Sequence, residues 1–162
     1  MLMTIDTRTA ALAVFFISAL TVIGAWIFQV AGYAPCPLCL MQRWAYYAAV
    51  PVSLVTVMMV ARDMRIARVL LVLIGLAFVA NAVFGVYHAG VEWKFWPGPG
   101  TCSGTLSGGL PTLGDTPVIS CEDAAIRILG LSLAGWNALI SAALALVAFA
   151  GARRYGSSSV SQ

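Results

Sequence analysis

Long apolar runs alternate with short polar links along this chain. Four runs stand out, at about 10–30, 44–61, 69–87 and 131–151. Crossing the hydrocarbon core of a bilayer, ~30 Å thick, takes about 20 apolar residues in a helix. Because backbone amides in lipid must be hydrogen-bonded within their own segment, we expect these runs to be helices. The pattern predicts an all-α integral membrane protein, a bundle of four transmembrane helices formed by residues 1–155.

The first run differs from a secretory signal peptide. It is longer than the apolar core of an ordinary signal, and no clean small-x-small cleavage site follows it. Ala34-Pro35-Cys36 is a poor substitute for such a site. We therefore expect a retained first helix.

Composition agrees with a membrane protein and excludes an ordinary soluble domain. The 162 residues are 61% hydrophobic and only 9% charged, whereas soluble domains carry about 25% charged residues. The basic residues are few and lie at the ends of the apolar runs, which argues against a nucleic-acid-binding surface.

Arginines mark one side of the predicted bundle. One precedes the first run, three lie between the second and third, and two follow the fourth: Arg8, Arg62, Arg65, Arg68, Arg153 and Arg154. By the positive-inside rule, these links and both termini are cytoplasmic. The long link at about 88–130 then faces outward. In a bacterial inner membrane it would be a periplasmic loop between helices 3 and 4.

Three polar segments have no membrane-crossing pattern. The stretch 96–117 is rich in Gly, Pro, Ser and Thr, which predicts an irregular, mobile loop. Residues 122–129 form a short amphipathic segment that we expect to lie along the membrane surface. The tail at 156–162 is of low complexity, and we expect it to be disordered.

Four cysteines lie in the two outer links, and none lies inside an apolar run. Cys36 and Cys39 form a Cys-x-x-Cys pair, whereas Cys102 and Cys121 are nineteen positions apart. All four fall on the predicted periplasmic side, which is oxidising and lets disulfides persist. Two dithiols at one membrane face suggest that electrons pass from one pair to the other.

The first pair lies where a helix is expected to begin. Pro35 and Pro37 favour a nearby helix start. Cys36, Cys39 and Arg43 then share one helical face. The positive end of the helix dipole and the guanidinium would both stabilise a thiolate. The alternatives are a structural disulfide and half of a zinc site, but the other cysteines form no second close pair, so we expect no metal.

The second pair has two interpretations, a structural disulfide or an exchangeable one that meets a soluble partner. Ser103-Gly104 after Cys102 would leave that sulfur open, and exchange requires access. By contrast, Cys121 is followed by the acidic pair Glu122 and Asp123.

Three further polar residues lie near the outer membrane edge. Arg43 is either a headgroup anchor or a partner of the thiols, and Gln42 beside it could add a hydrogen bond. His88, the only histidine, ends the third run on the outer side. It is either an interfacial cap or, if the helices bundle, a group at the same depth as Cys39 and Arg43.

These residues stand in motifs that resemble the DsbB family of bacterial inner-membrane disulfide-generating proteins. The segment Cys36-Pro-Leu-Cys39-Leu-Met-Gln-Arg43 resembles the family's Cys-x-x-Cys-x-x-Glu/Gln-Arg signature. The likeness continues, from about residue 10 to 154, in Tyr87-His88-Ala-Gly-Val-Glu-Trp, Cys102-Ser-Gly, Ser120-Cys121-Glu-Asp and Leu129-Gly-Leu-Ser-Leu-Ala-Gly-Trp-Asn137. An ordered set of motifs across four helices is much more specific than a lone Cys-x-x-Cys.

The resemblance implies a quinone-dependent protein-dithiol oxidase. A reduced DsbA-like protein, with a thioredoxin fold, would attack the Cys102–Cys121 disulfide at Cys102. Cys121 would pass electrons to the Cys36–Cys39 pair, and Cys39 would deliver them to a membrane quinone, either ubiquinone or menaquinone. By family position, Arg43 and His88 would flank the quinone ring, between the start of the second helix and the end of the third.

The chain departs from the family pattern at two places. The spacing from Cys102 to Cys121 is shorter than in the best-studied members, which leaves the order of exchange open. Gln42 stands where some members have Glu.

Three other functions remain as alternatives. A vitamin K epoxide reductase-like protein would normally place its loop cysteines before the Cys-x-x-Cys, whereas here they follow it. A transmembrane electron exporter would need thiols on both sides of the membrane. A non-catalytic scaffold would use its cysteines as structural disulfides only.

Overall fold

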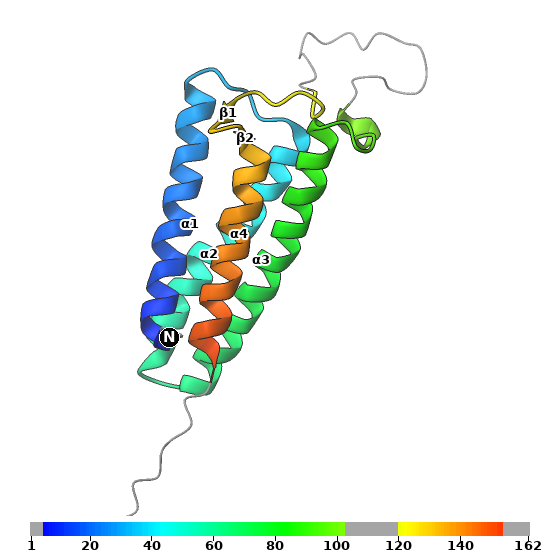
Figure 1. Ribbon diagram of the computed structural model, residues 1–162. Helices are drawn as coiled ribbons and strands as arrows, with labels where there is room; N and C mark the ends of the chain where they lie inside the picture. The colour runs from blue at the N-terminus through cyan, green and yellow to red at the C-terminus, as the bar shows by residue number, and fades with distance from the viewer. Residues whose placement is uncertain (1–4, 103–119, 154–162) are drawn as a thin grey trace, which may run out of the picture.

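Four long antiparallel helices form the bundle in the computed structural model, which describes residues 5–102 and 120–153 (Figure 1). They are α1 (Thr7–Val30), α2 (Pro37–Val60), α3 (Met64–Glu92) and α4 (Leu133–Ala152). Each is long and apolar enough to cross a membrane. The expected four-helix membrane bundle is therefore confirmed. The tail at 156–162 lies outside the described residues.

The helices extend beyond the apolar runs because capping groups, not hydropathy, set their ends. α2 begins at Pro37, with Cys36 as its N-cap, and α3 begins after Asp63, whose carboxylate accepts the backbone N–H groups of Arg65 and Ile66. A proline at the first helical position and an acidic N-cap both stabilise a helix start. At its other end α3 continues to Glu92, so His88 lies within the helix.

The segment before α4 contains a strand pairing that the sequence did not predict. Arg127–Ile128 (β1) pairs antiparallel with Leu131–Ser132 (β2), while the expectation that residues 122–129 lie along the membrane surface stays a prediction. Leu129 and Gly130 have φ of 53° and 82°, and two positive values in a row are typical of a tight hairpin turn. Ser132 then caps α4 by accepting the backbone N–H of Gly135 at 3.2 Å.

Small residues bring the helices together. A Cβ added at Gly85 of α3 would lie 3.0 Å from the backbone of Ala138 in α4. The hydroxyl of Thr7 in α1 donates to the carbonyl of Gly151 in α4 at 2.9 Å. Close backbone approach of this kind holds membrane helices together, because lipid supplies little hydrophobic drive.

A polar network crosses the bundle interior. The Tyr46 hydroxyl of α2 donates to Asn137 Oδ1 of α4 at 2.7 Å, and Asn81 Nδ2 of α3 donates to Ser141 Oγ of α4 at 2.9 Å. Polar groups inside a membrane are costly unless paired, and they often mark functional sites. The network ties three helices together at one level.

The two ends of the bundle differ in chemistry. The start of α1 and the end of α4 lie at the same end (Figure 1), where the α2–α3 link also turns. This end carries the arginines of the described chain, apart from Arg43 and Arg127. The described cysteines, the hairpin and η1 (Gly100–Cys102) lie at the opposite end.

Candidate redox site at the cysteine end of the bundle

All four cysteines meet in one apolar cluster. Cys36, Cys102 and Cys121 are buried together with Leu38 and Val91. Cys39 is half-buried and packs against the same cluster. The cluster joins the start of α2, the end of α3 and the two sides of the loop that follows. Residues that are distant in sequence therefore form a single site.

The two pairs are in different redox states. Cys102 and Cys121 form a disulfide with Cα atoms 5.1 Å apart, whereas Cys36 and Cys39 are free thiols. This combination, one oxidised pair beside one reduced pair, is what an exchange between the pairs requires.

Cys102 is not the open sulfur that its small neighbours suggested. It is only 1% exposed, as is Cys121. The chain leaving α3 folds back over the helix end, where the indole N–H of Trp96 donates to the Tyr87 carbonyl at 2.9 Å and the ring covers Gly90. This anchored segment, 93–102, presses Cys102 into the cluster. Ser103-Gly104 and the rest of the expected mobile loop, up to residue 119, lie outside the described residues.

Cys36 carries the thiolate of the reduced pair. As the N-cap of α2 it accepts the backbone N–H of Cys39 at 3.2 Å, at the positive end of the helix. Hydrogen bonds from the Cys39 thiol and from His88 lower the pKa of Cys36 to about 5, although burial opposes the shift. Cys36 is therefore a thiolate at neutral pH, which is the nucleophilic form.

His88 lies next to this thiolate and is buried, with 1% of its surface exposed. Its Nε2 is 3.6 Å from Cys36 Sγ, and its Nδ1 is 3.0 Å from the amide nitrogen of Gln42. One carboxylate oxygen of Glu92, a turn further along α3, lies 3.9 Å from the same Nε2. The imidazole thus bridges a thiolate and a carboxylate inside the bundle.

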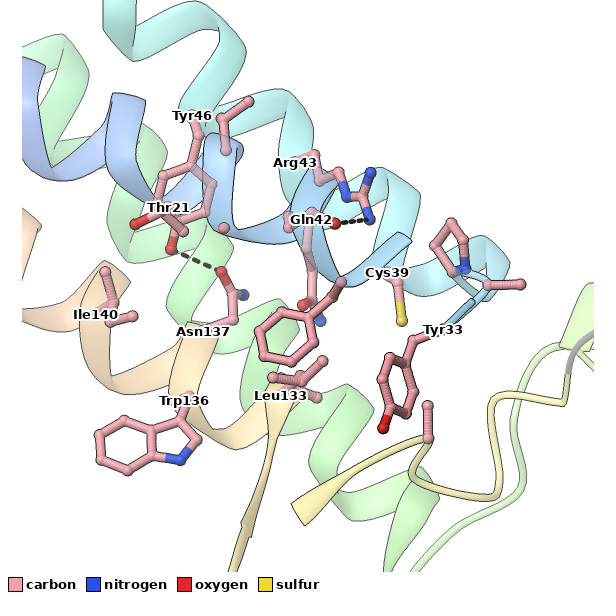
Figure 2. Close-up of a pocket in the computed structure, with 18 residues that line it drawn as sticks. Thr21, Tyr33, Cys39, Gln42, Arg43, Tyr46, Leu133, Trp136, Asn137 and Ile140 are labelled. Atoms are coloured by element: carbon pink, nitrogen blue, oxygen red, sulfur yellow. Dashed lines mark hydrogen bonds between the residues drawn. The ribbon is translucent and has the colours of Figure 1, made fainter. Parts of the chain in front are cut away.

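A cavity of about 280 Å³ opens on the other side of Cys39. Residues of α1, α2 and α4 line it, and Figure 2 shows among them Cys39, Gln42 and Arg43 on α2 and Trp136 and Asn137 on α4. Most of the remaining lining is apolar, including Phe28 and Ile140. The cavity could hold a flat apolar ring whose polar atoms meet Arg43, Gln42 and Cys39.

The position of this cavity differs from the expected quinone site. We expected a ring between the start of the second helix and the end of the third, flanked by Arg43 and His88. Arg43 lines the cavity, but His88 does not and reaches it only through Gln42. α1 supplies the wall instead, where Arg43 donates to Gln29 Oε1 at 2.8 Å and to the Ala25 carbonyl at 3.4 Å.

Sequence reasoning missed several residues of this site. Glu92 and Asn137 entered only as members of the motifs that carry the family resemblance, with no role assigned, and Tyr46 was not singled out. One signal was available for Asn137, because an amide within a membrane span is costly and therefore suggests a role. Glu92 offered another signal, since it follows His88 by four positions, the spacing of neighbours on one helix face. Tyr46 gave none, because aromatics near membrane edges are common.

Three groups of this site could bind a metal ion. The ligand atoms of Cys36, Cys39 and His88 lie within 4.8 Å of one another. A closed structural zinc site takes four protein groups, and the described residues bring together only these three.

Comparisons with known proteins show what the sequence of this chain is similar to. The family model "Disulfide bond formation protein DsbB" matches residues 7–151. A protein of Polaromonas sp. (strain JS666) named "Disulfide bond formation protein B" is 30% identical over 151 residues, which cover 86% of each chain. An uncharacterized protein of Rickettsia prowazekii is 28% identical over 120 residues, 69% of this chain and 67% of that one. No solved structure matches the chain.

Proposed function

Since this chain belongs to the DsbB family of disulfide bond formation proteins, we propose that it oxidises a periplasmic DsbA-like dithiol protein and passes the electrons to a membrane quinone. Membership in the family makes the chain a multi-pass membrane oxidoreductase of disulfide-bond formation. The observation that carries the finer proposal is the single buried cluster of both cysteine pairs, with Cys39 on the wall of the cavity.

The disulfide Cys102–Cys121 is the entry point for electrons. A thiolate of the partner attacks Cys102, the S–S bond breaks, and Cys121 leaves as a thiolate. The second thiol of the partner then attacks the mixed disulfide, which frees Cys102 and oxidises the partner. Two electrons have moved into the Cys102–Cys121 pair, and the two thiol protons of the partner balance the charge.

The second exchange passes the electrons inward. The Cys121 thiolate attacks an oxidised Cys36–Cys39 pair at Cys36, and Cys39 leaves as a thiolate beside the cavity. Cys102 then attacks the Cys36–Cys121 bond, which restores the outer disulfide and leaves the inner pair reduced. The outer pair is bonded and the inner pair is free in the structure, a pairing that supports this order of exchange.

The cavity fits a quinone headgroup. It is largely apolar, and Arg43 and Gln42 offer hydrogen-bond donors beside the Cys39 sulfur. A quinone bound there would supply an acceptor for two electrons and two protons; ubiquinone and menaquinone share this property. Arg43 holds a charge at the place where a carbonyl oxygen would gain electron density, which is a favourable electrostatic arrangement. His88 does not line the cavity and would influence a bound quinone only through its contacts with Gln42 and Cys36.

Reconstitution tests the proposal directly. The purified protein is placed in lipid with a reduced thioredoxin-fold partner and a quinone. The absorbance of the oxidised quinone should then fall at the rate at which the partner is oxidised. Thiol trapping should show both cysteine pairs changing state during turnover. If the cysteines stay in one redox state while reduced partner is present, the disulfide is a structural element and the proposed relay fails.

Replacing Arg43 should slow quinone reduction strongly. Loss of one charged contact costs roughly 1.5–3 kcal/mol, so Arg43→Ala should be about 10- to 150-fold slower. Arg43→Lys should recover only part of the rate, because lysine restores the charge without the planar fork. Arg62→Ala, at the opposite end of the bundle, is the matched control. A wild-type rate in Arg43→Ala would make this arginine a headgroup anchor.

We propose that the cysteine end faces the periplasm and that both termini face the cytoplasm of a bacterium. The arginines at the other end support this orientation through the positive-inside rule. A periplasm-active reporter inserted after Gly104 should be active, and one fused after Arg154 should be inactive. The reverse pattern would place the thiols in the reducing cytosol and contradict the proposed reaction.

A further inference from the structure

The carboxylate of Glu92 has no place in the electron relay described so far. Glu92 ends α3 and is only 9% exposed, and its Oε2 has no hydrogen-bond partner among the described residues. Burying a carboxylate is costly unless a nearby group compensates the charge. The groups around Glu92 therefore show how its charge is compensated and what the carboxylate acts on.

Three neighbours surround this carboxylate. His88 Nε2 lies 3.9 Å from Oε1, and the Ser132 side chain and Arg127 of β1 both favour the negative charge of the carboxylate. Ser132 is also the N-cap of α4. The hairpin before α4 thus supplies two of the groups that surround the carboxylate.

The imidazole faces Cys36 with the same nitrogen. Nε2 lies between Cys36 Sγ, at 3.6 Å, and Glu92 Oε1, at 3.9 Å. The amide of Gln42 contacts Nδ1 at 3.0 Å, and an amide can donate to a neutral ring or, once turned, accept from a charged one. The thiolate and the carboxylate therefore share one ring nitrogen, and Gln42 contacts the other, so Glu92 adds a negative charge beside the same Nε2 that faces Cys36.

We propose that Glu92 is a positioning residue that keeps a proton on His88 Nε2 and so holds Cys36 as a thiolate during exchange with Cys121. The inference rests on the proposed role of Cys36 in the relay. When Cys36 ionises, its proton passes to His88, and the carboxylate stabilises the imidazolium. When Cys36 next forms a disulfide, its electron pair enters the new S–S bond and the proton leaves His88.

Glu92 has two opposing electrostatic effects on the ionisation of Cys36. A carboxylate near a thiolate repels it, whereas a carboxylate near an imidazolium stabilises the charge that favours the thiolate. Glu92 Oε1 lies 3.9 Å from His88 Nε2, within direct reach of an imidazolium charge, and Arg127 offsets part of the negative charge that the thiolate meets. The other titratable group facing His88 is Cys39, which donates to the Cys36 sulfur. The net effect of Glu92 is to favour the Cys36 thiolate.

The test is the pH dependence of Cys36 alkylation in the full, reduced chain, read by peptide mass spectrometry after brief iodoacetamide treatment. Glu92→Gln keeps the shape and removes the charge. Its midpoint should rise from about 5 by about one unit, which makes alkylation roughly tenfold slower at pH 4, below both midpoints. Glu92→Asp should keep a low midpoint. Asp123→Asn, which removes an exposed acid from the same loop, should match the wild type.

A double variant separates positioning from a general loss of structure. If Glu92 acts through the imidazole, Glu92→Gln should have almost no further effect in a His88→Gln background. An unchanged or lowered midpoint in Glu92→Gln, or an equal shift with and without His88, would overturn the proposal. Alkylation needs neither quinone nor partner protein, so this result is independent of whether the proposed electron acceptor is right.

Discussion

Cys39→Ser should abolish electron transfer to quinone while leaving the outer disulfide able to react with its partner. Cys39 is the cysteine that lines the cavity, whereas Cys36, Cys102 and Cys121 do not. A serine hydroxyl is close in size to a thiol but cannot form a disulfide or release electrons at neutral pH. The inner pair would therefore lose its redox chemistry with little change in packing.

The measurement is quinone absorbance in the reconstituted system, with thiol trapping of the same samples. We expect no quinone consumption above background in Cys39→Ser, and one round of partner oxidation per chain through Cys102–Cys121. Ser53→Ala, a change at a buried hydroxyl lower in α2, provides a matched control for altered packing. Quinone reduction at the wild-type rate in Cys39→Ser would refute the proposed route through this sulfur.

Cys121→Ser should leave Cys102 able to trap the partner protein as a mixed disulfide. Both sulfurs are equally buried, at 1% exposure, so accessibility in this state does not distinguish them. The charges do, because Glu122 and Asp123 follow Cys121 and repel an approaching thiolate. Because Cys102 is buried, a partner can attack it only after the segment 93–102 moves away from the end of α3, where the Trp96 ring packs on Gly90.

Non-reducing electrophoresis after mixing with the oxidised partner measures the trap. The covalent complex should be the main product in Cys121→Ser and nearly absent in Cys102→Ser. A complex that forms only in Cys102→Ser would reverse the assignment and make Cys121 the entry point. Trp96→Ala in the Cys121→Ser chain should speed trapping, because it removes the ring that holds the segment down.

The membrane architecture of this protein was predictable from local composition alone. Each span must satisfy its own backbone hydrogen bonds in lipid, so a long apolar run is enough to specify a helix. The spacing of Cys36, Cys39 and Arg43 likewise predicted a shared face at the start of a helix, and α2 begins there. The links were less predictable: the hairpin at 127–132 depends on two positive φ values at Leu129 and Gly130, and only Gly130 signals them.

Tertiary structure alone decided how these groups meet. His88 and Glu92 are four positions apart on α3 and so share a helix face, but their burial was not predictable, because it depends on residues such as Ser132 and Arg127, which follow a long loop. The position of the cavity between α1, α2 and α4 follows from helix packing, which depends on close contacts such as Gly85 against Ala138. The sequence by itself determined the four spans and the pairs of thiols, since both depend on neighbours along the chain. Which helix faces which, and therefore which side chain reaches each sulfur, was decided by contacts between residues far apart in the chain.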